Sequence, residues 1–203
     1  MKREVIIVGA GPAGATAALE LAGMGHDVLL LDRARFPRPK VCGDGIIKYA
    51  LEIIDDLGSG EKIRRAGFYP IHGSRNVSHQ GTALDVESPD IGYIAPRRDL
   101  DALLLREATA AGAEFLQATV REPLCDGGRV SGVRVRVDNE PRELHARAVI
   151  DAGGIASPLA RKLRGRPLDP ARRAIAIRGY TDNLETLPNR CEFYAVGPPL
   201  GGY

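Results

Sequence analysis

The sequence is poor in cysteine, and its few cysteines form no recognisable pattern. Only three occur among 203 residues, at positions 42, 125 and 191, and none belongs to a CxxC pair. An odd, unpatterned set argues against a disulfide framework and a structural zinc site, and it favours a reducing compartment. The four histidines also lack metal-ligand spacing. We therefore expect a cytoplasmic protein without a metal centre.

Long apolar runs and an excess of one charge are missing as well. No apolar stretch reaches the ~20 residues that a membrane-spanning helix needs. The net charge of +2 is too small to indicate a nucleic-acid partner. Basic residues do gather between 161 and 166, where a solvated surface and contact with an anionic membrane or a phosphate are both open. Peripheral membrane contact thus stands beside a purely cytoplasmic location.

What the sequence does have, near its start, is a strand, a glycine turn, a helix and a second strand. Residues 5–8 are a continuous apolar run, as expected for a parallel strand buried on both faces. Small and aliphatic residues recur at helical spacing over 12–24, and 28–31 form the next apolar run. This order predicts an α/β fold built on a parallel sheet.

The turn itself, Gly9-Ala10-Gly11-Pro12-Ala13-Gly14, matches G-x-G-x-x-G, and Asp32 follows at the end of the second strand. A strand before it, a helix after it and this acid are the context in which the motif binds a dinucleotide. Gly9 permits the turn, Gly11 lets a pyrophosphate approach the backbone, and Gly14 lets the helix pack on the strand. Asp32 would accept hydrogen bonds from the adenosine ribose. The motif alone does not separate FAD from NAD.

The rest of the chain mixes helices with hairpins. Residues 46–57 and 97–112 have helical apolar spacing, and Asp44 is a candidate N-cap for the first of them. Residues 118–154 predict three hairpin strands around a D-G-G turn, followed by a short buried strand. Shorter strands are expected at three places: 68–93, 174–182 and 191–196.

The strand-rich segments do not fit the α/β layer and predict a second, sheet-based domain. We assign 1–67 and 96–167 to the dinucleotide-binding domain, and 68–95 and 168–203 to the second one. The chain stops at "GPPLGGY", a glycine loop directly after a predicted strand. Since that is a poor place for a domain to end, we expect the second domain to be incomplete here.

The stretch "RPKVCGDGI", residues 38–46, carries more turn residues than one reversal of direction requires. Such a loop lets the backbone approach something flat or charged. Cys42 within it is either a small buried hydrophobe or a functional thiol whose pKa a following helix N-terminus would lower. For Asp44, helix capping and a catalytic role are both open.

Four motifs together resemble the geranylgeranyl reductase family of FAD-dependent oxidoreductases, closest in look to its menaquinone/geranylgeranyl reductase branch. They are "GAGPAGATAALELA", "DRARFPRPKVCGDGI", "APRRDLDALLLREA" and "DAGGIASPLARKL". The resemblance implies a three-layer, Rossmann-like FAD/NAD(P)-binding fold with a second, strand-rich substrate domain. It also implies FAD as cofactor and reduction of carbon–carbon double bonds in an isoprenoid or prenylated lipid, with NAD(P)H or a small redox protein as electron donor. An aromatic hydroxylase or halogenase, or an inactive nucleotide-binding remnant, are the alternatives.

The resemblance also implies roles for single residues. The FAD pyrophosphate would lie on the turn, Asp32 with Arg33 beside it would meet the ribose, and Arg97 would reach the phosphates or ribitol. The backbone of Val120 would contact adenine. The isoalloxazine and the substrate channel would be lined by Cys42, Gly43, Asp44 and Gly45, with Cys42 facing the reaction chamber as the candidate catalytic residue.

One motif departs from the family pattern. Where relatives carry A-D-G or A-S-G, this chain has Ala152-Gly153-Gly154, so one polar contact near the cofactor is missing. Asp151 is close by but is expected to point to the opposite face of an extended segment.

Overall fold

The computed structural model describes residues 2–165, 171, 174–183 and 185–195. Their contacts divide the chain into two compact units. The first unit comprises Met1–Lys40 and Arg97–Ala176, and the second comprises Val41–Pro96 and Ile177–Tyr203. Among the described residues, none of the helices combines the length and the apolar composition that crossing a bilayer requires.

The first unit is built on a six-stranded sheet with the order β6-β2-β1-β9-β8-β7. Its strands are β1 (Lys2–Val8), β2 (Val28–Asp32), β6 (Glu114–Gln117), β7 (Thr119–Asp126), β8 (Arg129–Val137) and β9 (Glu140–Asp151). The four from β6 to β9 in this order run parallel, whereas β8 and β7 continue the sheet as antiparallel neighbours. The predicted α/β fold with a Rossmann-like core is confirmed, on a sheet that is mixed at one side.

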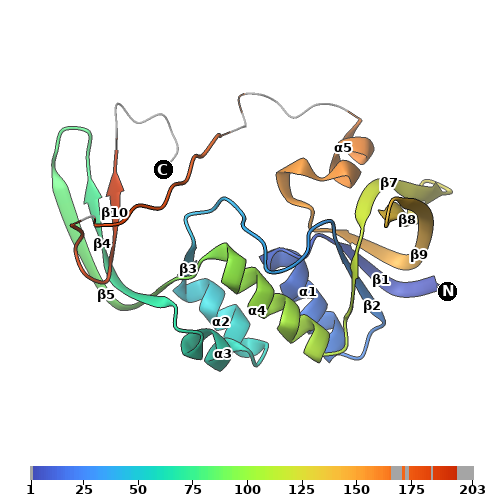
Figure 1. The fold of residues 1–203 in the computed structure, drawn as a ribbon, viewed down its shortest axis with the longest axis horizontal. Helices are drawn as coiled ribbons and strands as arrows, with labels where there is room; N and C mark the ends of the chain where they lie inside the picture. Colours follow the sequence, from blue (N-terminus) through green and yellow to red (C-terminus); the bar gives the residue numbers. More distant parts are fainter. Residues whose placement is uncertain (1, 166–170, 172–173, 184, 196–203) are drawn as a thin grey trace. The chain divides into compact units, whose positions relative to one another are not determined.

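Helices α1 (Pro12–Gly23) and α4 (Arg97–Ala110) pack against each other, and α1 also packs on β1 and β2 (Figure 1). Alanines 15, 18 and 22 are buried on α1, and their small side chains let the helix approach the sheet closely. Within the sheet, Ile6 and Leu31 are completely buried. A short 3-10 turn η1 (Gly154–Ala156) and helix α5 (Pro158–Arg164) follow β9. The sheet edge where β1 and β2 end thus stands on a rigid core.

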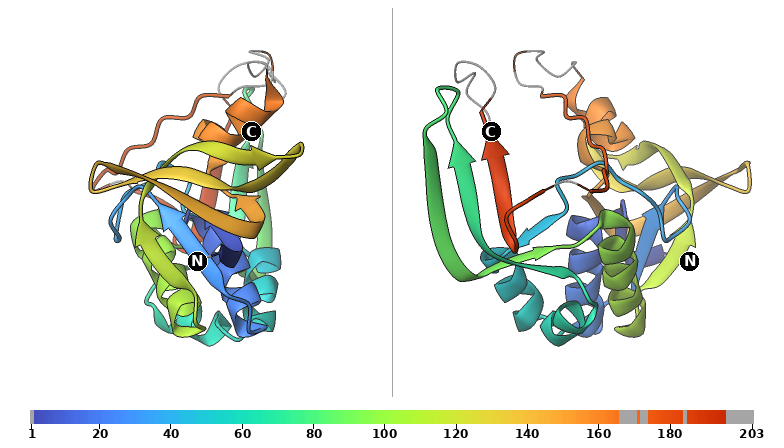
Figure 2. Two further views of the ribbon diagram at one scale, coloured as in Figure 1. Left: turned by 90° about the vertical axis from the view of Figure 1, so that its right-hand side faces the viewer. Right: turned by 60° about the vertical axis from the view of Figure 1, so that its left-hand side comes forward.

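The second unit is a four-stranded sheet with the order β10-β4-β5-β3 (Figure 2). Its strands are β3 (Gly45–Ile47), β4 (Tyr69–Val77), β5 (Ala83–Ile94) and β10 (Arg190–Tyr194), with helices α2 (Lys48–Asp56) and α3 (Gly60–Arg65). Strands β4 and β5 form a long hairpin, and β10 joins β4 in parallel. The short strand pieces expected over 68–93 are therefore two long strands, and the strand expected at 191–196 is confirmed as far as Tyr194.

Three predicted elements differ from the structure, two of them because of long-range strand pairing. The helix expected from residue 46 begins at Lys48, because β3 pairs with β5 before it. The short strand expected before Asp151 is the second half of β9, which pairs with β8 first and with β1 afterwards. The strand expected over 174–182 is wrong: these residues have no strand hydrogen bonding.

The contacts also divide the chain at places other than the expected domain boundaries. Residues 41–67 belong with the second unit, because β3 adds to the edge of β5 and α2 packs on both strands. Residues 171 and 174–176, in turn, are grouped with the first unit.

Candidate functional site

The glycine turn joins the end of β1 to the start of α1. Gly9 has a φ of +102°, in the left-handed region that favours glycine, and its N–H donates to the Leu31 carbonyl at 2.7 Å. Gly11 is the N-cap of α1 and Pro12 its first residue. Since a glycine N-cap has no side chain, it leaves the N–H groups of the first turn, and their partial positive charge, for a ligand.

The three glycines are required for different reasons. A Cβ on Gly9 would lie 2.4 Å from the Ala152 carbonyl oxygen, and one on Gly14 would lie 1.8 Å from the Gly9 carbonyl oxygen. Both positions therefore need glycine for the packing of the protein itself. A Cβ on Gly11 would meet only the tips of two arginines, at 3.5 and 3.9 Å. The packing of the protein therefore does not require glycine at position 11. The open space over Gly11 is what a bound pyrophosphate needs.

Those two arginines, Arg38 and Arg97, share the carboxylate of Asp101, which is completely buried within α4. Arg97 donates to both carboxylate oxygens, at 2.5 and 2.8 Å, and Arg38 Nη1 lies 2.9 Å from Oδ2. Arg38 Nη2 also lies 3.8 Å from Asp32 Oδ2, so the two guanidinium groups beside Gly11 are held by two carboxylates. A guanidinium fork held in place in this way suits a phosphate, because little side-chain freedom remains to be lost on binding.

Asp32 lies at the end of β2 and ties the turn to the following loop. Its Oδ2 accepts from the Ala10 N–H and its Oδ1 from the Ala34 N–H, each at 2.9 Å. Each ionised oxygen still has a lone pair for a further donor such as a ribose hydroxyl.

A pocket of about 400 Å³ opens at this edge of the sheet in the first unit. It brings together five of the residues singled out from the sequence: Gly9, Asp32, Arg33, Val120 and Gly153. Arg121 and Arg161 also line it and add positive charge. Its position past the ends of β1 and β2 is where parallel α/β sheets bind nucleotides. Of the other candidates, Pro12, Ala13 and Gly14 start α1, and Gly154 starts η1.

The departure at Gly153 has a structural explanation in Asp151. Its Oδ1 accepts from the Gly153 N–H at 3.0 Å, while its Oδ2 accepts from the Ser157 hydroxyl at 2.5 Å and the Ala160 N–H at 3.0 Å. A Cβ on Gly153 would lie 3.1 Å from this carboxylate. The expectation that Asp151 points to the opposite face is therefore wrong. Its side chain holds η1 and α5 together and fills the space beside Gly153.

The remaining candidates, Cys42 and residues 43–45, lie in the second unit. Cys42 is half-buried, and an added Cβ at Gly43 or Gly45 would meet no described atom within 4 Å. Asp44 does not cap α2, whose N-cap is Ile47. Its side chain is buried instead and accepts hydrogen bonds from Arg178 and Tyr180.

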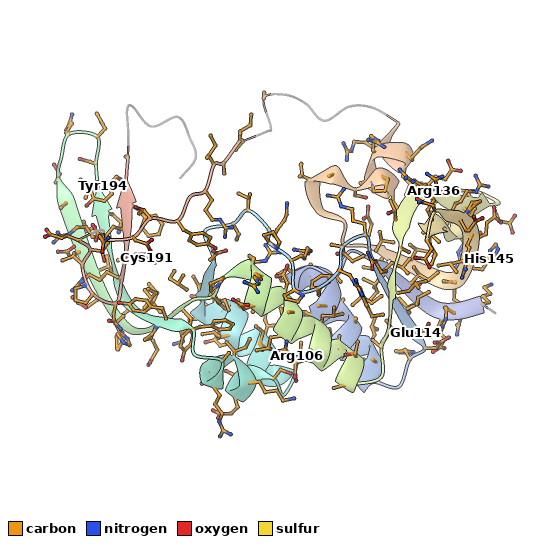
Figure 3. All side chains as sticks on the ribbon, viewed as in Figure 1. Arg106, Glu114, Arg136, His145, Cys191 and Tyr194 are labelled. Atoms are coloured by element: carbon orange, nitrogen blue, oxygen red, sulfur yellow. The ribbon has the colours of Figure 1, made fainter. Side chains whose placement is uncertain are left out.

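The next residues to consider are the other cysteines and the histidines, as candidate nucleophiles or metal ligands. Burial raises the pKa of the Cys191 thiol on β10 (Figure 3), so this thiol stays protonated. His145 on β9 (Figure 3) is half exposed and lies 4.0 Å from a Glu143 carboxylate oxygen. Across the described part of the chain, no three His, Cys, Asp or Glu side chains gather as a metal site.

Sequence reasoning missed Arg38, Asp101 and Arg121 as site residues, whereas Arg161 belongs to the basic cluster for which contact with a phosphate was one of two interpretations. Asp101 did leave a signal, because an acid inside the apolar stripe of a helix, four residues after Arg97, indicates a buried ion pair. Arg38 was visible only as one charge in a loop, and nothing local tells which partner it finds.

Comparison with known proteins agrees with this geometry. The chain is 39% identical over 167 residues to digeranylgeranylglycerophospholipid reductase 2 of Methanopyrus kandleri. The matched region covers 79% of this chain and 40% of that protein. It is 33% identical over 196 residues to menaquinone reductase of Mycobacterium tuberculosis, covering 87% of the chain and 44% of the relative. The chain thus spans less than half the length of these curated relatives.

Solved structures give the same fold. A geranylgeranyl bacteriochlorophyll reductase-like protein from Thermoplasma acidophilum superposes with a TM-score of 0.77 at 23% identity, over 96% of this chain and 50% of that one. A variant of a flavin-dependent brominase gives 0.73 at 28% identity, over 79% of this chain and 41% of its own. The family model described as "FAD binding domain" matches residues 2–173. The resemblance drawn from the sequence motifs is therefore confirmed, and the chain belongs to the FAD-binding domain family.

Proposed function

We propose that the protein to which this chain belongs is an FAD-dependent oxidoreductase that reduces carbon–carbon double bonds of a geranylgeranyl-type isoprenoid chain. The observation that carries the proposal is the open space over Gly11 between two guanidinium groups, in a chain 39% identical to a digeranylgeranylglycerophospholipid reductase. The arrangement suits a pyrophosphate, and the relatives' names supply the class of substrate. Because a prenylated lipid resides in a bilayer, the proposal includes peripheral contact with a membrane.

In this proposal the first unit binds the pyrophosphate, the ribose and the adenine of FAD. The N–H groups at the start of α1 and the arginines Arg38 and Arg97 take the pyrophosphate. Asp32 accepts from the adenosine ribose hydroxyls, and the backbone of Val120 contacts adenine. Arg33 provides a cationic wall of the adenosine pocket.

The second unit serves as part of a substrate domain, and residues 42–45 meet the isoalloxazine and the alkene. FAD bound there and reduced by NAD(P)H or a small redox protein would supply the hydride for one alkene carbon, and the other carbon would take up a proton. An isolated alkene is not polarised, so the protein must supply much of the rate by aligning it and excluding water. In the proposal, that is the task of the Cys42 segment.

The proposal is tested on the purified full-length protein. We expect it to be yellow, with FAD released on denaturation, and to add one H₂ per double bond to a geranylgeranylated glycerophospholipid when a reductant is supplied. Mass spectrometry of the lipid measures the gain. A denatured extract that contains NAD and no flavin, or a lipid of unchanged mass with fully reduced enzyme, would contradict the proposal.

A second candidate, an FAD-dependent halogenase, is favoured by one observation. The chain is 30% identical over 164 residues to a pyrrolyl-carrier-protein brominase of Pseudoalteromonas luteoviolacea. The same preparation, given oxygen, bromide and a pyrrolyl substrate, separates the two functions. Bromination without lipid reduction would replace the reductase with the halogenase.

Replacing Cys42 by alanine should leave FAD bound and should lower alkene reduction about tenfold. The neighbouring glycine backbone still meets the flavin ring, whereas the shape of the reaction chamber changes where alignment sets the rate. Flavin reduction by the electron donor should change little, since that step does not use the alkene pocket. Stopped-flow absorbance and product analysis measure the two steps separately, with the exposed Cys125→Ala as control. Unchanged product formation would make Cys42 an ordinary buried cysteine.

A further inference from the structure

Asp44 in the second unit combines a buried carboxylate with a left-handed backbone conformation, and each of these two features costs free energy. The residue is 4% exposed and has a φ of +61°. A left-handed conformation is strained for residues with a Cβ and free for glycine. A buried carboxylate must also be paired or it neutralises. The turn by itself requires no more than a glycine, so we look for the role of Asp44 in the contacts of its side chain.

Its partners come from a segment far along the chain. Arg178 Nη1 donates to Asp44 Oδ2 at 2.7 Å, and the Tyr180 hydroxyl donates to the same oxygen at 2.9 Å. Arg178 also donates to the Tyr180 hydroxyl oxygen at 2.5 Å, and its guanidinium lies 4.4 Å from the centre of the tyrosine ring. Three side chains thus close a compact cluster, which we call the Asp44 clamp.

The clamp holds the segment that carries Cys42. From the other side, the Ala95 N–H donates to the Asp44 carbonyl at 2.6 Å, and Gly45 pairs with Ile94 at the start of β3. Backbone and side chain of Asp44 are therefore fixed by different elements. The side-chain contacts to Arg178 and Tyr180 thus hold residue 44 in addition to its backbone hydrogen bond.

We propose that Arg178 and Tyr180 are positioning residues: through Asp44 they fix the conformation of residues 42–45 and so set the orientation of Cys42. The link to alkene reduction rests on the proposed function; the mechanical link to Cys42 does not. The charge pair is suited to this role because removing one partner of a buried ion pair leaves the other charge poorly compensated, which is costly.

The test measures how fast iodoacetamide alkylates Cys42 in the full-length, FAD-loaded protein, read by peptide mass spectrometry with the exposed Cys125 as internal reference. Arg178→Met and Asp44→Gly should each raise the Cys42 rate about tenfold, because a loosened segment opens more often. Arg178→Met is the sharper variant because it leaves residue 44 unchanged, whereas Asp44→Gly relieves the left-handed strain but also gives that residue more backbone freedom. Tyr180→Phe should give a smaller rise, and Arg178→Lys should restore most of the wild-type rate.

A matched control lies on the hairpin of the same unit. Arg75 forms a bidentate pair with Asp85, at 2.8 Å for both bonds, and both side chains are partly exposed. Arg75→Met makes the same chemical change at an ion pair away from Cys42, and should leave its alkylation unchanged. A Cys42 rate within about twofold of wild type in both Asp44→Gly and Arg178→Met would overturn the proposal.

Catalysis supplies a second readout. In Asp44→Gly, kcat for alkene reduction should fall about tenfold with KM and flavin content nearly unchanged, as expected when alignment and not binding is lost. If the wild-type protein reduces no prenylated lipid, the proposed function fails, while the alkylation rates still decide whether the clamp fixes Cys42.

Discussion

Replacing Gly11 by valine should abolish FAD binding and leave the first unit folded. The valine Cβ would meet only Arg97 Nη2 at 3.5 Å and Arg38 Nη2 at 3.9 Å, which are ordinary van der Waals contacts. The backbone at Gly11 is extended, with φ −74° and ψ −176°, and any residue adopts that conformation. The two methyl groups, however, would occupy the space between the helix N-terminus and the guanidinium groups.

We expect FAD affinity to fall by about 100-fold or more, because several charge-assisted hydrogen bonds to the pyrophosphate are lost together. Flavin absorbance per protein and a fluorescence titration of the apoprotein measure the loss. Gly23→Val is the matched control: it lies at the end of α1, where an added Cβ meets no described atom within 4 Å. Wild-type flavin occupancy in Gly11→Val would show that the turn does not hold phosphate.

The first unit was predictable as far as local pattern decides it. A continuous apolar run, a glycine turn and an acid at the end of the next strand lie within 32 residues, and some of their contacts are with one another. The hydrogen bond from the Ala10 N–H to Asp32 is one such local closure. Such short-range constraints survive in any context, so the turn and its two strands appeared where expected.

Asp44 shows why other parts could not be predicted. Its position before a helical pattern favoured an N-cap, but its side-chain partners Arg178 and Tyr180 stand 134 and 136 residues further on. A local hydrogen bond and a distant ion pair compete for the same carboxylate, and burial decides between them. Residues 174–182, which carry these two partners, join no strand ladder.

The arginine pair gives the same lesson for the site. Arg97 was assigned to the phosphates through the family pattern, yet its side chain is held by Asp101, which also pairs with Arg38. Arg38 lies 59 residues before Arg97 in the sequence, and residues 41–96 of the second unit separate them. A charge in a loop carries no information on its partner, since opposite charges occur throughout the sequence. Only the fold of α4 against the loop after β2 brings the three together.

Replacing Gly14 by alanine should damage the first unit itself, in contrast to the change at Gly11. The new Cβ would lie 1.8 Å from the Gly9 carbonyl oxygen and 3.2 Å from the Ala152 Cβ. The nearest of these atoms belongs to the backbone of the turn, so α1 or the end of β1 must move. Overpacking of this kind costs about 3 kcal/mol, and we expect the apoprotein to unfold at a clearly lower temperature than wild type.

Gly11→Ala is the matched control, because it adds the same methyl group where the nearest atom is 3.5 Å away. Its apoprotein should melt like wild type, while both variants lose FAD affinity to different degrees. Circular dichroism of the two apoproteins makes the comparison without any contribution from bound flavin. Equal melting temperatures would mean that the turn relaxes around residue 14 at little cost. A clear difference would show that one motif carries two separate demands: the packing of α1 on β1 requires Gly14, and room for the dinucleotide requires Gly11.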